Sequence, residues 1–87
     1  MQHRAAVSAT AVKHKKCAEA AEGKENWPTA GFRWSDAAVQ YELLEDEDAS
    51  QRAWCRAANA FNNANMDDGR ERCVGHLKRP EDIIICL

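Results

Sequence analysis

The pattern of apolar positions near the start of the chain predicts a helix over residues 3–22. Its apolar face carries Val7, Ala11, His14, Ala18 and Ala21. Alanine buries little area, so we expect this helix to pack closely without supplying the core by itself. Gly23 is expected to end the helix, because glycine adopts the left-handed conformation at little cost.

Residues 24–34 are predicted to form a connector, since Pro28 and Gly31 interrupt helical periodicity. This stretch is rich in aromatic residues and includes Trp27 and Trp34. A connector with so many rings is expected to fold back onto the core. The alternative is an exposed aromatic patch, in which Trp27 and Trp34 contact a partner.

A second helix is predicted from Ser35 to about Glu45. Ser35 is a suitable N-cap, and Asp36 places a carboxylate in the first turn, where the helix dipole favours it. The inward face would consist of Ala37, Ala38, Tyr41 and Leu44. Three consecutive acidic residues, 46–48, are expected to interrupt the helix.

The third predicted helix has the strongest amphipathic pattern in the chain and begins at Asp48 or Ser50. Its apolar face carries Trp54, Ala57, Ala58, Phe61 and Ala64. Its polar face carries Arg52, Arg56, Asn59 and Asn63. A helix of this kind should bury Trp54 and Phe61 in the core.

The remaining residues predict a turn at Met66–Gly69, a short helix or irregular segment over residues 70–79, and a stop at Pro80. Ile83–Leu87 is predicted to be a buried strand or an apolar tail. No internal repeat is apparent. A chain of 87 residues accommodates one domain, so we predict that residues 1–87 form a mainly α bundle of about three helices.

Overall charge and hydropathy exclude several classes of protein. With 12 basic and 14 acidic residues, the chain as a whole offers no argument for nucleic acid or an acidic membrane surface. No apolar run approaches the roughly 18 residues of a transmembrane helix. The first 21 residues lack the apolar core of a secretion signal, so we expect a cytoplasmic protein with reduced cysteines. A mitochondrial presequence is the weaker alternative.

Two pairs of cysteine and histidine share a spacing of three residues. They are His14 with Cys17 and Cys73 with His76. Together they would supply the four ligands of a tetrahedral zinc ion. The spacing differs from that of common zinc fingers, and the alternative is that both cysteines are small packed side chains beside ordinary histidines.

Five carboxylates lie within seven residues, an uneven distribution that the net charge conceals. They are Glu42, Glu45, Asp46, Glu47 and Asp48. Near a helix C-terminus they would repel one another and be disfavoured by the dipole. We expect a basic surface to neutralise them, either the chain's own residues 13–16 or a partner. A solvated helix end is the simpler alternative.

No catalytic motif or nucleotide-binding loop is present, so the sequence predicts a non-catalytic interaction protein: a regulator, inhibitor or adaptor. It would bind the basic surface of another protein through the acidic residues 42–48, with Trp27 and Trp34 nearby. A homo-oligomer is compatible with the sequence. The alternative is a zinc-stabilised module that binds nucleic acid through Arg52, Arg56 and Asn59.

Overall fold

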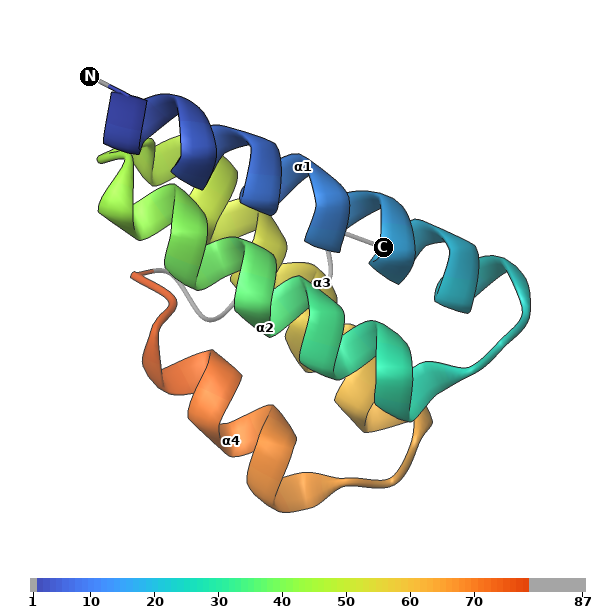
Figure 1. Cartoon of the computed structure of the whole chain (residues 1–87). Coiled ribbons are helices and arrows are strands. Elements are labelled where there is room, and N and C mark those ends of the chain that lie inside the picture. Colours follow the sequence, from blue (N-terminus) through green and yellow to red (C-terminus); the bar gives the residue numbers. More distant parts are fainter. Residues whose placement is uncertain (1, 79–87) are drawn as a thin grey trace.

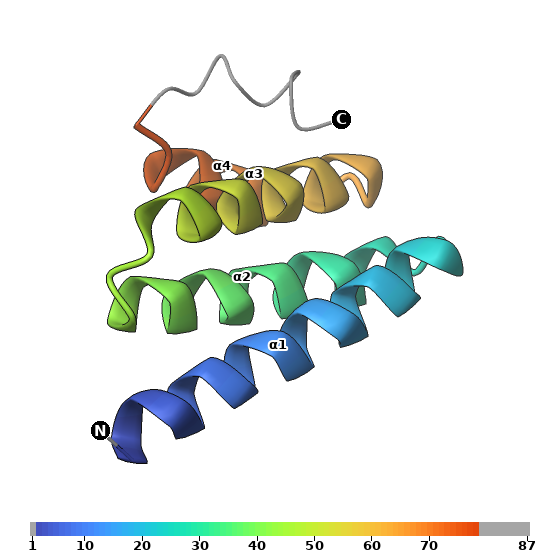
Figure 2. The same cartoon turned by 90° about the horizontal axis from the view of Figure 1, so that it is seen from above.

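Four helices follow one another in a computed structural model that describes residues 2–78. They are α1 (Gln2–Gly23), α2 (Trp27–Leu43), α3 (Glu47–Asn63) and α4 (Asp67–Gly75). Each helix packs antiparallel on the one before it (Figures 1 and 2). The prediction of a small, mainly α protein is confirmed. The predicted strand or tail at Ile83–Leu87 lies outside the described residues.

α2 begins eight residues earlier than the sequence pattern predicted. The prediction of a connector over residues 24–34 is wrong, because Trp27 opens the helix and Pro28 lies in its first turn. Proline is tolerated there because backbone N–H groups in the first turn make no hydrogen bond within the helix, so the N–H that proline lacks is not needed. Ser35 is therefore not an N-cap; it lies within the helix, and its hydroxyl donates to the carbonyl of Gly31 at 2.9 Å.

Two glycines inside helices allow the ring of Phe61 to approach the backbone. A Cβ atom at Gly31 would lie 2.7 Å from the ring, and one at Gly69 would lie 2.9 Å from it. These separations are too short for any side chain. Gly31 and Gly69 are therefore packing positions in α2 and α4, rather than the breaker and the turn residue that the sequence predicted.

The three loops between the helices share one backbone conformation. The residues with positive φ are Glu25 (57°), Glu45 (58°) and Asn65 (58°), whereas no described glycine has a positive φ. After each, a backbone N–H bonds back across the loop: Asn26 to Ala21 at 2.8 Å, Asp46 to Tyr41 at 3.0 Å, and Met66 to Phe61 at 2.9 Å. Gly23 is thus not the left-handed residue, and the chain has a 20-residue structural repeat that the sequence analysis missed.

The repeat extends to the side chains that α2 and α3 bury. The matching pairs are Trp34 and Trp54, Ala37 and Ala57, Ala38 and Ala58, and Tyr41 and Phe61. All are buried except Tyr41, which is partly buried and packs against the core. The shared pattern consists of only one tryptophan, two alanines and one aromatic ring. It is therefore too short to be recognised as a repeat in the sequence.

The core lies along the three helix–helix interfaces and is made largely of alanine around a few large rings. The predicted apolar faces are confirmed at Val7, Ala11, Ala18 and Ala21 of α1 and at Trp54, Ala57, Ala58 and Phe61 of α3. Small side chains let the helices approach closely, and each buried ring contributes more apolar area than an alanine does.

One cysteine departs from the expectation that all thiols are reduced. Cys17 and Cys73 carry free thiols, whereas Cys55 is disulfide-bonded. The prediction is therefore wrong for Cys55. No helix among residues 2–78 is long and apolar enough to cross a membrane.

Candidate binding pocket at the loop between α2 and α3

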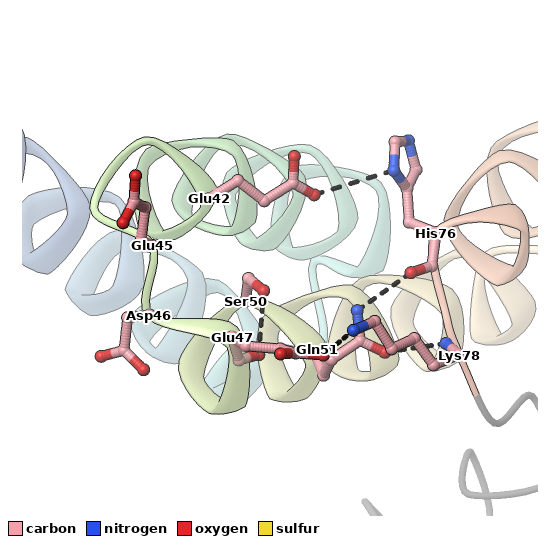
Figure 3. A pocket seen from close by; sticks show the side chains of 8 residues that line it. All are labelled: Glu42, Glu45, Asp46, Glu47, Ser50, Gln51, His76 and Lys78. Carbon is pink, nitrogen blue, oxygen red and sulfur yellow. Dashed lines mark hydrogen bonds and ion pairs between the residues drawn. The ribbon is translucent and has the colours of Figure 1, made fainter.

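An open pocket of about 390 Å³ lies where the loop between α2 and α3 faces the end of α4 (Figure 3). Its lining consists of Glu42, Glu45, Asp46, Glu47, Ser50, Gln51, His76 and Lys78. Four of these are carboxylates, so we call it the acidic pocket. It gathers four of the five predicted acidic residues; the fifth, Asp48, is not part of its lining.

Local helix geometry explains how the chain tolerates these carboxylates. Glu42 lies in the last turn of α2, and Glu45 lies in the loop. Asp46 is the N-cap of α3, since its side chain accepts a hydrogen bond from the Ala49 N–H at 3.2 Å. Glu47 and Asp48 occupy the first turn of α3, where the dipole favours negative charge. The expectation that all five lie at a helix C-terminus is therefore wrong, as is the expected N-cap at Asp48 or Ser50.

Two lining residues of the acidic pocket, Glu42 and His76, both contact Trp54, which does not itself line the pocket. The indole N–H of Trp54 on α3 donates to Oε1 of Glu42 on α2 at 2.6 Å. The ring of His76, just after α4, stacks on the Trp54 ring with centroids 3.9 Å apart and an interplanar angle of 3°. His76 Nδ1 lies 3.8 Å from the same carboxylate oxygen, so a protonated His76 would pair with Glu42.

The chain that leaves α4 is held against α3 by Gln51. Its amide nitrogen donates to the His76 carbonyl, and its amide oxygen accepts from the Lys78 N–H, both at 2.9 Å. The Lys78 ammonium pairs with the Glu47 carboxylate. These contacts fix His76 and Lys78 at the rim of the acidic pocket (Figure 3).

The five carboxylates of residues 42–48, here called the acidic run, are only partly neutralised within the described chain. The neutralising charge comes from Lys78 and, when protonated, from His76, and no ion pair joins the run to the basic residues 13–16. Over residues 2–78, the structure shows no ion pair for the other three carboxylates of the run, Glu45, Asp46 and Asp48. Among the described residues that line the pocket, four carboxylates therefore outnumber the two basic side chains.

The predicted aromatic patch does not form at Trp34. Only 3% of this residue is exposed, and the guanidinium of Arg56 covers its ring at 4.7 Å from the centroid. Trp27 is half-buried and packs against the core. Trp34 therefore packs on the core, as expected, although it does so from a helix and not from a connector. Because it is buried, Trp34 is not available to contact a partner.

Exposed apolar side chains lie elsewhere on α2, at positions that the sequence analysis overlooked. They are Phe32, Val39 and Leu43, exposed by 50%, 43% and 60%. Their spacing of seven and four residues places them on one helix face. This signal was hidden because residues 24–34 were not expected to be helical.

The polar face of α3 is only partly available for nucleic acid. Arg52 is exposed, but Arg56 donates to the Glu22 carboxylate at 2.6 Å while covering Trp34. Asn59 is half-buried. α2 and α3 lie side by side and antiparallel (Figure 2), whereas the two helices of a helix-turn-helix cross at about 90–120°. This arrangement does not match a helix-turn-helix.

The contact between a carboxylate, an indole and a basic side chain recurs at an interval of 20 residues. The first set is Glu22, Trp34 and Arg56, and the second is Glu42, Trp54 and His76. In the second set the indole N–H of Trp54 bonds to the carboxylate. In the first set Trp34 Nε1 has no hydrogen-bond partner. Each set ties three consecutive helices together.

The four predicted zinc ligands do not converge. Among residues 2–78, no group of three or more His, Cys, Asp or Glu side chains is placed to hold a metal ion. His14 instead lies 3.2 Å from an Arg33 nitrogen. Burial raises the pKa of the Cys73 thiol, despite its contact with the Ser35 hydroxyl at 3.5 Å and the charge of Arg72. A raised pKa disfavours the thiolate that zinc requires.

We therefore expect zinc to have no effect on stability. Addition of equimolar zinc, or of a chelator to the purified protein, should leave the melting temperature and the circular dichroism spectrum unchanged. The matched control is Cys17→Ser, which should melt identically with and without zinc. A rise in melting temperature with zinc that Cys17→Ser abolishes would contradict this expectation.

The chain was compared with protein-family models, with curated proteins and with solved structures. None of them matches.

Proposed function

We propose that the protein is a non-catalytic interaction protein, a regulator, inhibitor or adaptor, which binds a basic surface of another protein through the acidic pocket. The observation that carries this proposal is the gathering of four carboxylates around one open pocket. Within the described chain, only Lys78 and His76 supply basic groups to that pocket.

Electrostatics favours a basic partner for this pocket. A surface concavity lined by one sign of charge concentrates the field and speeds the encounter with an oppositely charged molecule. The exposed apolar side chains of α2 begin next to the pocket, since Leu43 adjoins Glu42. They would add contact area that charge alone does not provide, because apolar burial supplies most of the affinity of protein interfaces.

Removing three of the carboxylates is expected to slow binding. The variant is Glu45→Gln, Asp46→Asn and Glu47→Gln. Asparagine preserves the N-cap at position 46, so the fold should be retained. The association rate with a captured partner, measured at low salt, should fall by about tenfold or more, with a smaller change in the dissociation rate.

The matched control neutralises three exposed acids outside the pocket: Glu19→Gln, Glu25→Gln and Asp68→Asn. It changes the net charge equally and should bind as the wild type does. Partners would be captured from nuclease-treated cell extract. Identical capture and identical rates for all three proteins would contradict the proposal. Recovery of nucleic acid from untreated extract, lost in an Arg52→Gln variant, would favour the nucleic-acid alternative.

A further inference from the structure

The outer face of α2 carries an apolar stripe, which consists of Phe32, Val39 and Leu43. These are three of the four large apolar side chains that the described chain exposes. Asp36 lies between them at helical spacing and is also exposed. From Phe32 to Leu43 the stripe covers 12 residues of helix, a rise of about 16 Å or roughly three turns.

The repeat provides an internal comparison for this stripe. The positions of α3 that correspond to Phe32, Val39 and Leu43 are occupied by polar residues, namely Arg52, Asn59 and Asn63. A helix of the same length and loop conformation therefore forms with polar side chains at these positions. Phe32 also packs against the core ring Phe61, so this comparison applies to Val39 and Leu43: the repeated helix forms without apolar side chains at their positions.

A groove of about 320 Å³ lies beside the stripe, between α2 and α4. Phe32 and Asp36 form its α2 side, Trp54 and Phe61 of α3 contribute its aromatic lining, and Arg72 and His76 line its α4 side. His76 also lines the acidic pocket, so the groove and the pocket adjoin at this residue. The groove thus meets the stripe at Phe32 and the acidic pocket at His76.

We propose that this surface accepts an amphipathic helix of a partner protein, with apolar residues at i, i+4, i+7 and i+11 and basic residues at one end. The apolar face would cover the stripe, and the basic end would lie against the acidic pocket beyond Leu43. Charge complementarity identifies the basic end of the occupant, because four carboxylates line the pocket that this end would meet. This inference rests on the proposed function and names its partner.

Synthetic peptides of 16 residues test the recognition directly. The first has leucine at i, i+4, i+7 and i+11 and four lysines at one end. The second has the same composition with the leucines distributed around the helix, and the third replaces the lysines with glutamate. Fluorescence anisotropy with the full chain should show binding of the first peptide, and binding weaker by about tenfold or more for the other two.

Variants of the chain then locate the contact. Val39→Asn with Leu43→Asn introduces the residue type that α3 carries at the corresponding positions, so the melting temperature should be unchanged. Affinity for the first peptide should fall by about tenfold or more. The control is Val12→Asn, which removes an exposed apolar side chain from α1 and should leave affinity unchanged.

The outcomes separate this inference from the proposed function. The first peptide could bind the variant at residues 45–47 more weakly and the Val39/Leu43 variant normally. That result would overturn the helix-docking inference and leave the proposed function standing. The reverse result would overturn the role of the acidic pocket and, with it, the proposed function. Self-association by sedimentation that disappears in the Val39/Leu43 variant would assign the stripe to a second copy of this chain and overturn the inference.

Discussion

Replacing Phe61 with alanine should lower the free energy of unfolding by about 3–5 kcal/mol. The ring is 2% exposed, contacts two glycines, and packs edge-to-face against Phe32 with centroids 5.2 Å apart. Its removal leaves a cavity between α2, α3 and α4 that the helical backbones cannot close. For a small domain with a total stability of about 5–15 kcal/mol, the loss is severe. Urea denaturation measures it, and an unchanged midpoint would show that α3 is placed in the wrong register.

A second substitution, Gly31→Ala, tests the close approach of the Phe61 ring to α2, and its effect on stability should change sign when the ring is removed. Gly31→Ala in the wild type should destabilise, because the added Cβ would lie 2.7 Å from the Phe61 ring. In the Phe61→Ala background the ring is absent, so Gly31→Ala should stabilise by up to about 1 kcal/mol through its higher helix propensity. Additive effects in the double mutant cycle would contradict the close approach.

Replacing Trp54 with alanine is expected to cost a similar amount, about 3–5 kcal/mol, and to release α4. Only 5% of Trp54 is exposed, and its ring supports His76 while its N–H bonds to Glu42. Trp54→Phe keeps a ring in place and loses that hydrogen bond, so it should cost about 1 kcal/mol. Limited trypsin digestion should cleave after Arg70 and Arg72 in Trp54→Ala at concentrations that spare the wild type.

His76→Arg serves as the matched control for this contact, because Arg56 occupies the corresponding position over Trp34. An arginine can cover the Trp54 ring and pair with Glu42, so the variant should resist cleavage after Arg70 and Arg72 as the wild type does, and cleavage at the new site after position 76 is scored separately. His76→Ala removes both contacts and should increase cleavage. Equal cleavage of His76→Ala and the wild type would show that α4 is held by other contacts.

Part of the acidic pocket could be predicted from the sequence. The acidic residues 42–48 were recognised as a group from the sequence, and four of them line one pocket. Their dipole environment was misjudged, since placing Glu47 and Asp48 in the first turn of α3 required the boundary between two helices. Trp34 packs in the core, as the favoured expectation for the aromatic rings had it, but its burial does not fit the assignment as a partner contact; the side chain that covers it, Arg56, comes from another helix.

The sequence by itself determined which residues of α1 and α3 face the core, because a helical period of apolar residues reports burial wherever the helix is regular. It did not determine where α2 begins. Pro28 and Gly31 resemble breakers locally, but a proline in a first turn and a glycine beneath a ring are both compatible with a helix.

Only the tertiary structure decided how the repeated helices combine. The left-handed residues Glu25, Glu45 and Asn65 carry no glycine signature, so the identical loops were not recognisable from residue type. The groove, the acidic pocket and the contact of Trp54 with His76 each join residues from helices far apart in the sequence. Such contacts depend on how the helices pack against one another, and no single helix encodes that arrangement in its own period.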